Sequence, residues 1–174
     1  MPTARHSRIV AAPVQELWEV IRDPHHLPRW WPRVSRVENV EGHAFTEVMK
    51  TARGKVVRAD FDLIEADEGR RVLKWEQRVE NTPFARLLKS AETEVRLAPV
   101  AAPRAGVAPS EHDSQPLAAG DAPGPREDPT VTEVTIELHQ TLNGFLARLG
   151  SYMVRRAMAA TLEEALDGLE RISG

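Results

Sequence analysis

The apolar positions near the C-terminus repeat with the period of an amphipathic helix. Between Asn143 and Ile172 two apolar stripes run at spacings of three and four residues, which places each stripe on one helix face. The stripes lie about 130° apart around the axis, so the pattern predicts that the two halves of the helix bury different faces. The stripes are Leu142, Leu146, Leu149, Met153, Ala157 and Ala160, and then Val154, Met158, Leu162, Ala165, Leu169 and Ile172.

The sequence allows two starting points for this helix. Asn143 has a side chain that can cap a helix N-terminus. Gly150 costs about 1 kcal/mol relative to alanine inside a helix, so it indicates either a kink or a later start at Ser151.

The rest of the chain alternates apolar and polar residues as strands do. Pro13 opens a short helix that ends at Asp23-Pro24, because the residue before proline avoids the helical region. A short second helix or a turn follows around Trp30. The predicted strands are 5–10, 34–41, 45–51, 56–65, 71–79, 91–97 and 130–141. This order predicts an α+β fold in which an antiparallel sheet of about seven strands wraps around the long helix.

Gly54 sets the register of one hairpin. If it takes the left-handed last position of a three-residue loop, Phe45 faces Phe61 and Met49 faces Val57. A two-residue turn would instead pair apolar residues with polar ones, namely Val57 with Lys50 and Phe61 with Thr46. The apolar match favours the three-residue loop. In the next hairpin the pattern places Leu63 opposite Leu73 and Phe61 opposite Trp75.

Residues 99–129 differ in composition from everything around them. They hold seven of the 13 prolines, many alanine, glycine and acidic residues, and no aromatic residue. Such a segment cannot bury enough apolar surface to order itself. We therefore expect one domain, 1–174, with a disordered insertion at about 99–129.

Composition excludes several classes of site. The chain has no cysteine, which removes disulfides and thiol chemistry. None of the six histidines is spaced to share a metal ion with another, so no metal and no cofactor is expected. A net charge of −3 argues against nucleic acid as the main partner. No run of about 18 apolar residues is present, so we expect no membrane span and a cytoplasmic location. The abundance of arginine and alanine suggests a GC-rich bacterial genome.

One face of the predicted sheet carries the candidate site. Large apolar residues from three strands share this face with Glu47 and Gln77, which the favoured register sets on either side of small Ala59. The face could be plain core, or it could line a ligand cavity beside the helix. Glu47 could be hydrated at an open end of the sheet, or it could form the polar end of a pocket. The predicted ligand-binding residues are Phe45, Glu47, Met49, Phe61, Trp75, Gln77, Thr93, Met153 and Met158.

The N-terminal stretch resembles the polyketide cyclase/dehydrase group of the START-like SRPBCC superfamily. That group opens with a strand, Ala-Pro, an aromatic residue in the first helix, Asp-Pro and a Trp-x-Pro-like turn. This chain matches it with Ala12-Pro13, Trp18, Asp23-Pro24 and Trp30 followed by Pro32. The resemblance covers about 1–98 and 130–172, and the insertion departs from it. It implies the helix-grip fold of the major birch pollen allergen, with two short helices after the first strand and an apolar cavity under the last helix.

The resemblance implies three classes of function. Members of the group bind or carry hydrophobic small molecules, including lipids, some are aromatase/cyclases, and relatives of the heat-shock-protein-90-activator type bind a protein. No catalytic motif carries over residue by residue. We favour a protein that carries or sequesters a hydrophobic small molecule. The alternatives are a cyclase or dehydrase with Glu47 as general acid or base, and a protein-interaction module.

Overall fold

An antiparallel sheet and a long helix are the main elements of the described part of the chain. The structure, a computed structural model, describes residues 2–51, 53–100, 131–144 and 150–174. Seven strands lie in the order β1-β7-β6-β5-β4-β3-β2. The strands are β1 (Thr3–Val10), β2 (Val34–Glu41), β3 (Ala44–Lys50), β4 (Val56–Asp67), β5 (Val72–Gln77), β6 (Leu88–Pro99) and β7 (Thr132–Leu142). The helices are α1 (Val14–Arg22), α2 (Leu27–Trp30) and α4 (Ser151–Ser173), with 3-10 turns η1 (Pro24–His26) and η2 (Pro83–Arg86).

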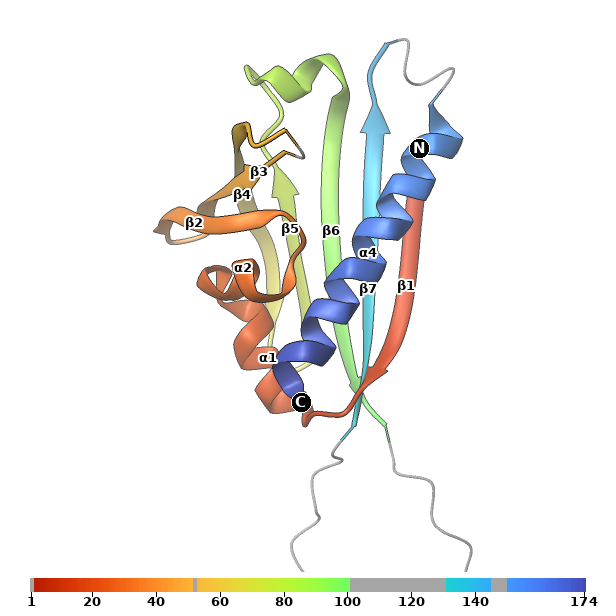
Figure 1. Cartoon of the computed structure of the whole chain (residues 1–174). Coiled ribbons are helices and arrows are strands. Elements are labelled where there is room, and N and C mark those ends of the chain that lie inside the picture. The colour runs from red at the N-terminus through yellow and green to blue at the C-terminus, as the bar shows by residue number, and fades with distance from the viewer. Residues whose placement is uncertain (1, 52, 101–130, 145–149) are drawn as a thin grey trace, which may run out of the picture.

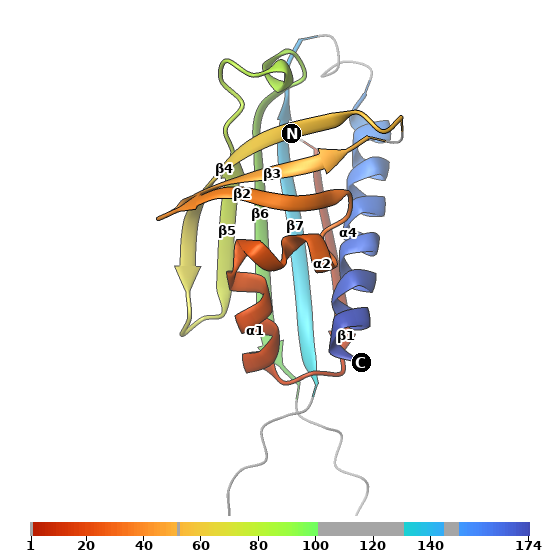
Figure 2. The same ribbon diagram turned by 60° about the vertical axis from the view of Figure 1, so that its left-hand side comes forward.

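The sheet curves around α4, as the helix-grip prediction required. Figure 1 shows α4 lying across the concave face of the sheet, and Figure 2 shows α1 and α2 on the same side, next to its C-terminal half. The core fills the space between these helices and the strands. It includes Trp18 and Leu17 of α1, Trp30 of α2, and Ile136 of β7, each at most 2% exposed.

The second apolar stripe of α4 faces the core, as predicted. Leu162, Ala165 and Leu169 have no measurable exposure. The prediction that the first stripe is also buried is wrong for its described residues on α4, since Met153 is 73% exposed and Ala157 and Ala160 are exposed as well. A straight helix against one sheet can bury one face, and the two stripes lie too far apart to share it.

Helix α4 begins at Ser151 with Gly150 as its N-cap residue, the later of the two predicted starts. Residues 145–149 lie outside the described residues, so the predicted cap at Asn143 is not tested. The Asn143 side-chain amide donates a hydrogen bond to the carbonyl of Ala85 at 2.8 Å. This bond ties the loop after β7 to η2.

The C-terminal half of α4 is held from two sides. On α2, the backbone of Trp30 comes so close that a Cβ at Gly168 would lie 2.7 Å from its Cα, which leaves room for glycine alone. On β1, the Arg8 guanidinium donates to Glu163 at 3.0 Å and to Glu170 at 3.1 Å, and it also pairs with Asp167. These contacts fix the helix where it covers the core.

The β3–β4 hairpin has the register that Gly54 predicted. Phe45 pairs with Phe61, and Met49 pairs with Val57. Gly54 has a φ of +74°, and its N–H donates to the Thr51 carbonyl at 2.8 Å to close the loop. A left-handed residue is needed at this position, which glycine adopts without strain.

The predicted register of the β4–β5 hairpin is wrong by two residues. Trp75 lies opposite Leu63, whereas Phe61 lies opposite Gln77. Strand β4 extends to Asp67, and an irregularity between Leu63 and Glu65 shifts the pairing. Since side chains alternate with a period of two, a shift of two keeps the β4 residues from Phe61 to Leu63 on their predicted faces.

The first two residues of the predicted insertion, Pro99 and Val100, belong to the β6–β7 pairing. Pro99 still pairs with Thr132, and the N–H of Val100 donates to the carbonyl of Val131 at 3.0 Å. The rest of the segment, 101–129, lies outside the described residues. We propose that 1–174 form one helix-grip domain that is interrupted there.

Replacing residues 101–130 with Asn-Gly is expected to leave the fold intact. Val100 and Val131 are already hydrogen-bonded as the closing residues of a hairpin, and Asn-Gly favours a two-residue hairpin turn. Loop length changes stability slowly, by about 0.6 kcal/mol per doubling. Four halvings of loop length favour the folded state by about 2.4 kcal/mol, so thermal unfolding monitored by circular dichroism should show one cooperative transition, at a melting temperature about 5–10 °C above that of the full chain. Loss of the cooperative transition would show that the segment packs on the domain.

Candidate functional site

The candidate site is a cavity of about 370 Å³ between the concave face of the sheet and α4. Its volume falls within the range of about 300–1,000 Å³ typical of small-molecule sites. Strands β3 to β7 form one wall, and the N-terminal half of α4 forms the other. The lining residues are Trp31, Glu47, Met49, Phe61, Trp75, Gln77, Ala91, Glu92, Thr93, Leu138, Gln140, Val154, Ala157, Met158 and Thr161.

Register and alternation bring the strand residues together. Glu47 and Met49 share a face of β3, and Phe61 follows on β4 opposite Gln77 of β5. Thr93 of β6 lies opposite both Trp75 and Leu138. These pairings place polar and apolar groups side by side on one concave wall.

Seven of the nine residues predicted to bind a ligand line this cavity, and two do not. Phe45 is part of the core below it, where its ring stacks on Phe61 with centroids 5.3 Å apart. Met153 belongs to the outward face of α4 and is 73% exposed. Gln77 lines the cavity but lies opposite Phe61 instead of Ala59, because of the shifted β4–β5 register.

Glu47 is the buried acid of the site. Its side chain is 2% exposed, and its Oε1 has no hydrogen-bond partner among the described residues. Burial raises the pKa of Glu47 from 4.5 to about 8. The carboxyl is therefore mostly protonated at pH 7 and presents an O–H donor.

Gln77 provides a second polar group without a partner. Its Nε2 is buried and, within the described part of the chain, forms no hydrogen bond. An unpaired buried amide costs about 1–3 kcal/mol, which an incoming acceptor would recover. The protonated Glu47 and the Gln77 amide together offer donors to a carbonyl or hydroxyl oxygen.

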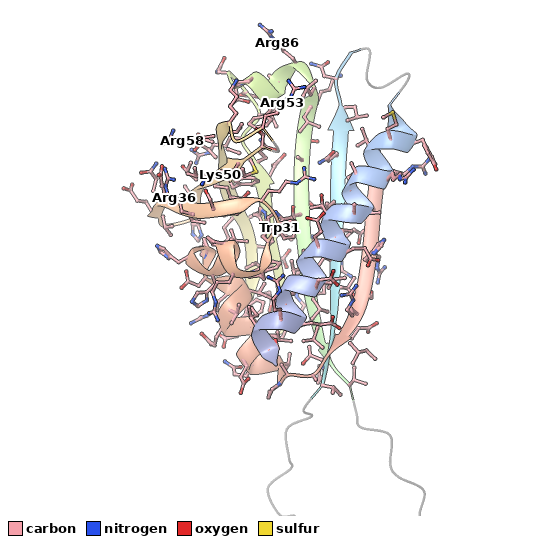
Figure 3. The ribbon with its side chains drawn as sticks, in the orientation of Figure 1. Trp31, Arg36, Lys50, Arg53, Arg58 and Arg86 are labelled. Carbon is pink, nitrogen blue, oxygen red and sulfur yellow. The ribbon has the colours of Figure 1, made fainter. Side chains whose placement is uncertain are left out.

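Trp31 is the main lining residue that sequence reasoning missed. It follows α2, and its ring packs edge-on against Trp75 with centroids 5.7 Å apart. Figure 3 shows Trp31 between the sheet and α4. The proline-flanked tryptophan pair gave no periodicity from which to infer its direction. In contrast, the alternation of β6 and β7 and the i, i+4 spacing from Met158 were available signals for other missed residues, namely Ala91, Leu138, Gln140 and Val154.

The described residues contain no group of three or more histidine, cysteine or acidic side chains arranged to hold a metal ion. No described helix is long and apolar enough to cross a membrane.

Comparison with known families agrees with the fold. A family model described as "Polyketide cyclase / dehydrase and lipid transport" matches residues 1–174. The chain belongs to this family. The membership confirms the resemblance inferred from the N-terminal stretch. A search of curated proteins finds no match to this polyketide cyclase/dehydrase family member.

Solved structures with the same fold include aromatase/cyclases and a START protein. The di-domain ARO/CYC BexL from the BE-7585A biosynthetic pathway is 20% identical with a TM-score of 0.69, covering 98% of this chain and 46% of that one. A START superfamily protein from Mycobacterium smegmatis is 12% identical with a TM-score of 0.69, covering 99% and 97%. The Zhui aromatase/cyclase from Streptomyces sp. R1128 is 17% identical with a TM-score of 0.61, covering 97% and 88%. This family member thus spans about half of the BexL chain, and the likenesses show the helix-grip fold.

Proposed function

We propose that the protein binds a hydrophobic small molecule that carries a carbonyl or hydroxyl oxygen. The observation that carries the proposal is the cavity, in which apolar side chains surround two buried polar atoms, Glu47 Oε1 and Gln77 Nε2, that have no hydrogen-bond partner among the described residues. Apolar walls provide affinity, and a few placed polar groups fix the orientation of the ligand. Family membership supports the same class of ligand.

A neutral apolar dye tests this proposal directly. N-phenyl-1-naphthylamine is expected to bind wild type with a rise in its fluorescence, as it enters an apolar site. Ala91→Phe is expected to abolish this binding, because a phenyl ring would fill space in the cavity that Ala91 lines. Ala98→Phe on the same strand is the matched control, since Ala98 is exposed and lies outside the lining. Equal dye binding by both variants would contradict the proposal.

A second candidate function is an enzyme of the cyclase or dehydrase type. The observation in its favour is Glu47, whose pKa of about 8 lies near neutrality, where a general acid–base catalyst works best. In this alternative Glu47 would transfer a proton on the bound molecule, and Gln77 would orient a carbonyl oxygen.

Native mass spectrometry of the purified protein separates a carrier from a dehydrating enzyme. A carrier is expected to retain a co-purified molecule at constant mass during incubation. A dehydrating enzyme would release a product lighter by one water, and Glu47→Gln would slow that loss. Recovery of an unchanged ligand from wild type and from the Glu47→Gln variant would favour the carrier.

A further inference from the structure

One end of the molecule carries exposed cations from three separate segments. The β3–β4 loop contributes Arg53 and Lys55, η2 contributes Arg86, and the first turns of α4 contribute Arg155 and Arg156. Both ribbon views place these three segments at the same end, and Figure 3 labels Arg53 and Arg86 there. We call these five residues the basic end.

The positive charge of the basic end is not neutralised by neighbouring acidic side chains among the described residues. Within the described residues, none of its five side chains is in a salt bridge. Glu80 is the acidic residue among the described parts of the connections that form this end. The whole chain has a net charge of −3, so the excess of cations here contrasts with the rest of the surface.

Exposed apolar side chains gather in the same segments. Val56 follows the β3–β4 loop and is 45% exposed, and Leu87 follows η2 and is 48% exposed. Tyr152 and Met153, in the first turn of α4, are 70% and 73% exposed. Among the described residues, four of the six large exposed apolar side chains therefore lie beside the basic end. Apolar side chains that cluster on the surface of a protein usually mark an interaction site.

We propose that this end docks on an anionic phospholipid membrane surface. Each arginine or lysine close to such a surface contributes an attraction of about fivefold in binding. Protruding apolar and aromatic side chains interspersed with cations can enter the interface between headgroups and acyl chains. A nucleic acid would neutralise the cations but would give no reason for the four exposed apolar side chains.

The cavity lies next to this end. Its lining includes Val154, which sits between Met153 and Arg155 on α4, and Ala91 near the start of β6. Docking would therefore bring the cavity beside the lipid phase. Membrane docking is a property separate from the proposed ligand binding, because it can be measured with the cavity empty or filled.

Sedimentation of the full chain with lipid vesicles tests the proposal. Wild type is expected to bind vesicles of phosphatidylcholine with phosphatidylglycerol, to bind less as salt is raised, and not to bind phosphatidylcholine alone. The triple change Arg53→Ala, Lys55→Ala and Arg86→Ala is expected to weaken binding roughly 100-fold. A control triple change of the same charge in exposed arginines away from this end, Arg29→Ala, Arg70→Ala and Arg171→Ala, is expected to leave vesicle binding unchanged, although Arg70 is paired with Glu65 and Asp67.

The apolar residues distinguish a membrane from another polyanion. Tyr152→Ala with Met153→Ala is expected to weaken vesicle binding, while any retention on heparin stays constant. The proposal is overturned if wild type fails to bind the anionic vesicles at low salt, or if both triple variants lose binding equally. Unchanged vesicle binding by the Tyr152/Met153 variant would likewise overturn it. The Ala91→Phe variant should still bind vesicles, so a failure of the cavity proposal would be seen separately.

Discussion

At pH 8 the Glu47→Gln variant is expected to be more stable than wild type by roughly 4 kcal/mol. The reason is that folding of wild type buries a carboxyl group at a position where its ionised form is disfavoured. Burial raises the pKa of Glu47 from 4.5 to about 8. Between these two values the unfolded chain loses the proton while the folded chain retains it. Wild-type stability therefore falls by about 1.4 kcal/mol per pH unit across this window, and glutamine removes that slope.

Urea unfolding from pH 4 to pH 9 measures this difference. The two proteins should have similar free energies of unfolding below pH 4.5, diverge up to about pH 8 and then differ by a constant amount. The matched control is Glu94→Gln. Burial would raise the pKa of Glu94, but hydrogen bonds from Lys74 and Arg96 lower it overall. This variant should be destabilised near neutrality, and its deficit should vanish in acid. Parallel curves for wild type and Glu47→Gln would show that Glu47 is charged and hydrated in the folded protein.

Leu162→Ala is expected to lower the free energy of unfolding by about 2–5 kcal/mol, the range for buried leucine truncations. Leu162 has no measurable exposure and packs in the core, so the change leaves a cavity. Met153→Ala on the same helix is the control, since Met153 is 73% exposed and should change stability by less than about 0.5 kcal/mol. Denaturant unfolding at one pH gives both values. A small effect at Leu162 would mean that α4 presents a different face to the sheet.

The two hairpins show what local sequence can determine. The β3–β4 register followed from Gly54, because one left-handed residue fixes the loop length and the apolar pairs agree with it. The β4–β5 register did not follow, because the irregularity between Leu63 and Glu65 changes the pairing by one residue, and the alternation of Phe61 and Leu63 before it gives no sign of that change. Sequence therefore predicted which residues face inward and missed how far along the strand they sit.

The candidate site was predictable for the same reason. Residues such as Glu47 and Trp75 were placed by strand parity, which survives a shift of two. Met153 was misplaced because both stripes of α4 have helical spacing, and periodicity alone does not say which stripe meets the sheet. Trp31 reaches the cavity from an irregular segment, where its direction depends on contacts with Trp75 that form in the folded chain.

Helix α4 is held in place by contacts of its C-terminal half, and it borders the cavity with its N-terminal half. Gly168 against Trp30 and Arg8 against Glu163 and Glu170 hold its C-terminal half, whereas Val154 and Met158 border the cavity. Ser151 lies about 25 Å along the helix from Gly168, so a tilt of ~5° about Gly168 would displace the first turn by ~2 Å. That distance is close to the size of a methyl group. Such a tilt would change the width of the cavity by about one methyl group near the first turn of α4, while the leucines near Gly168 would keep their contacts.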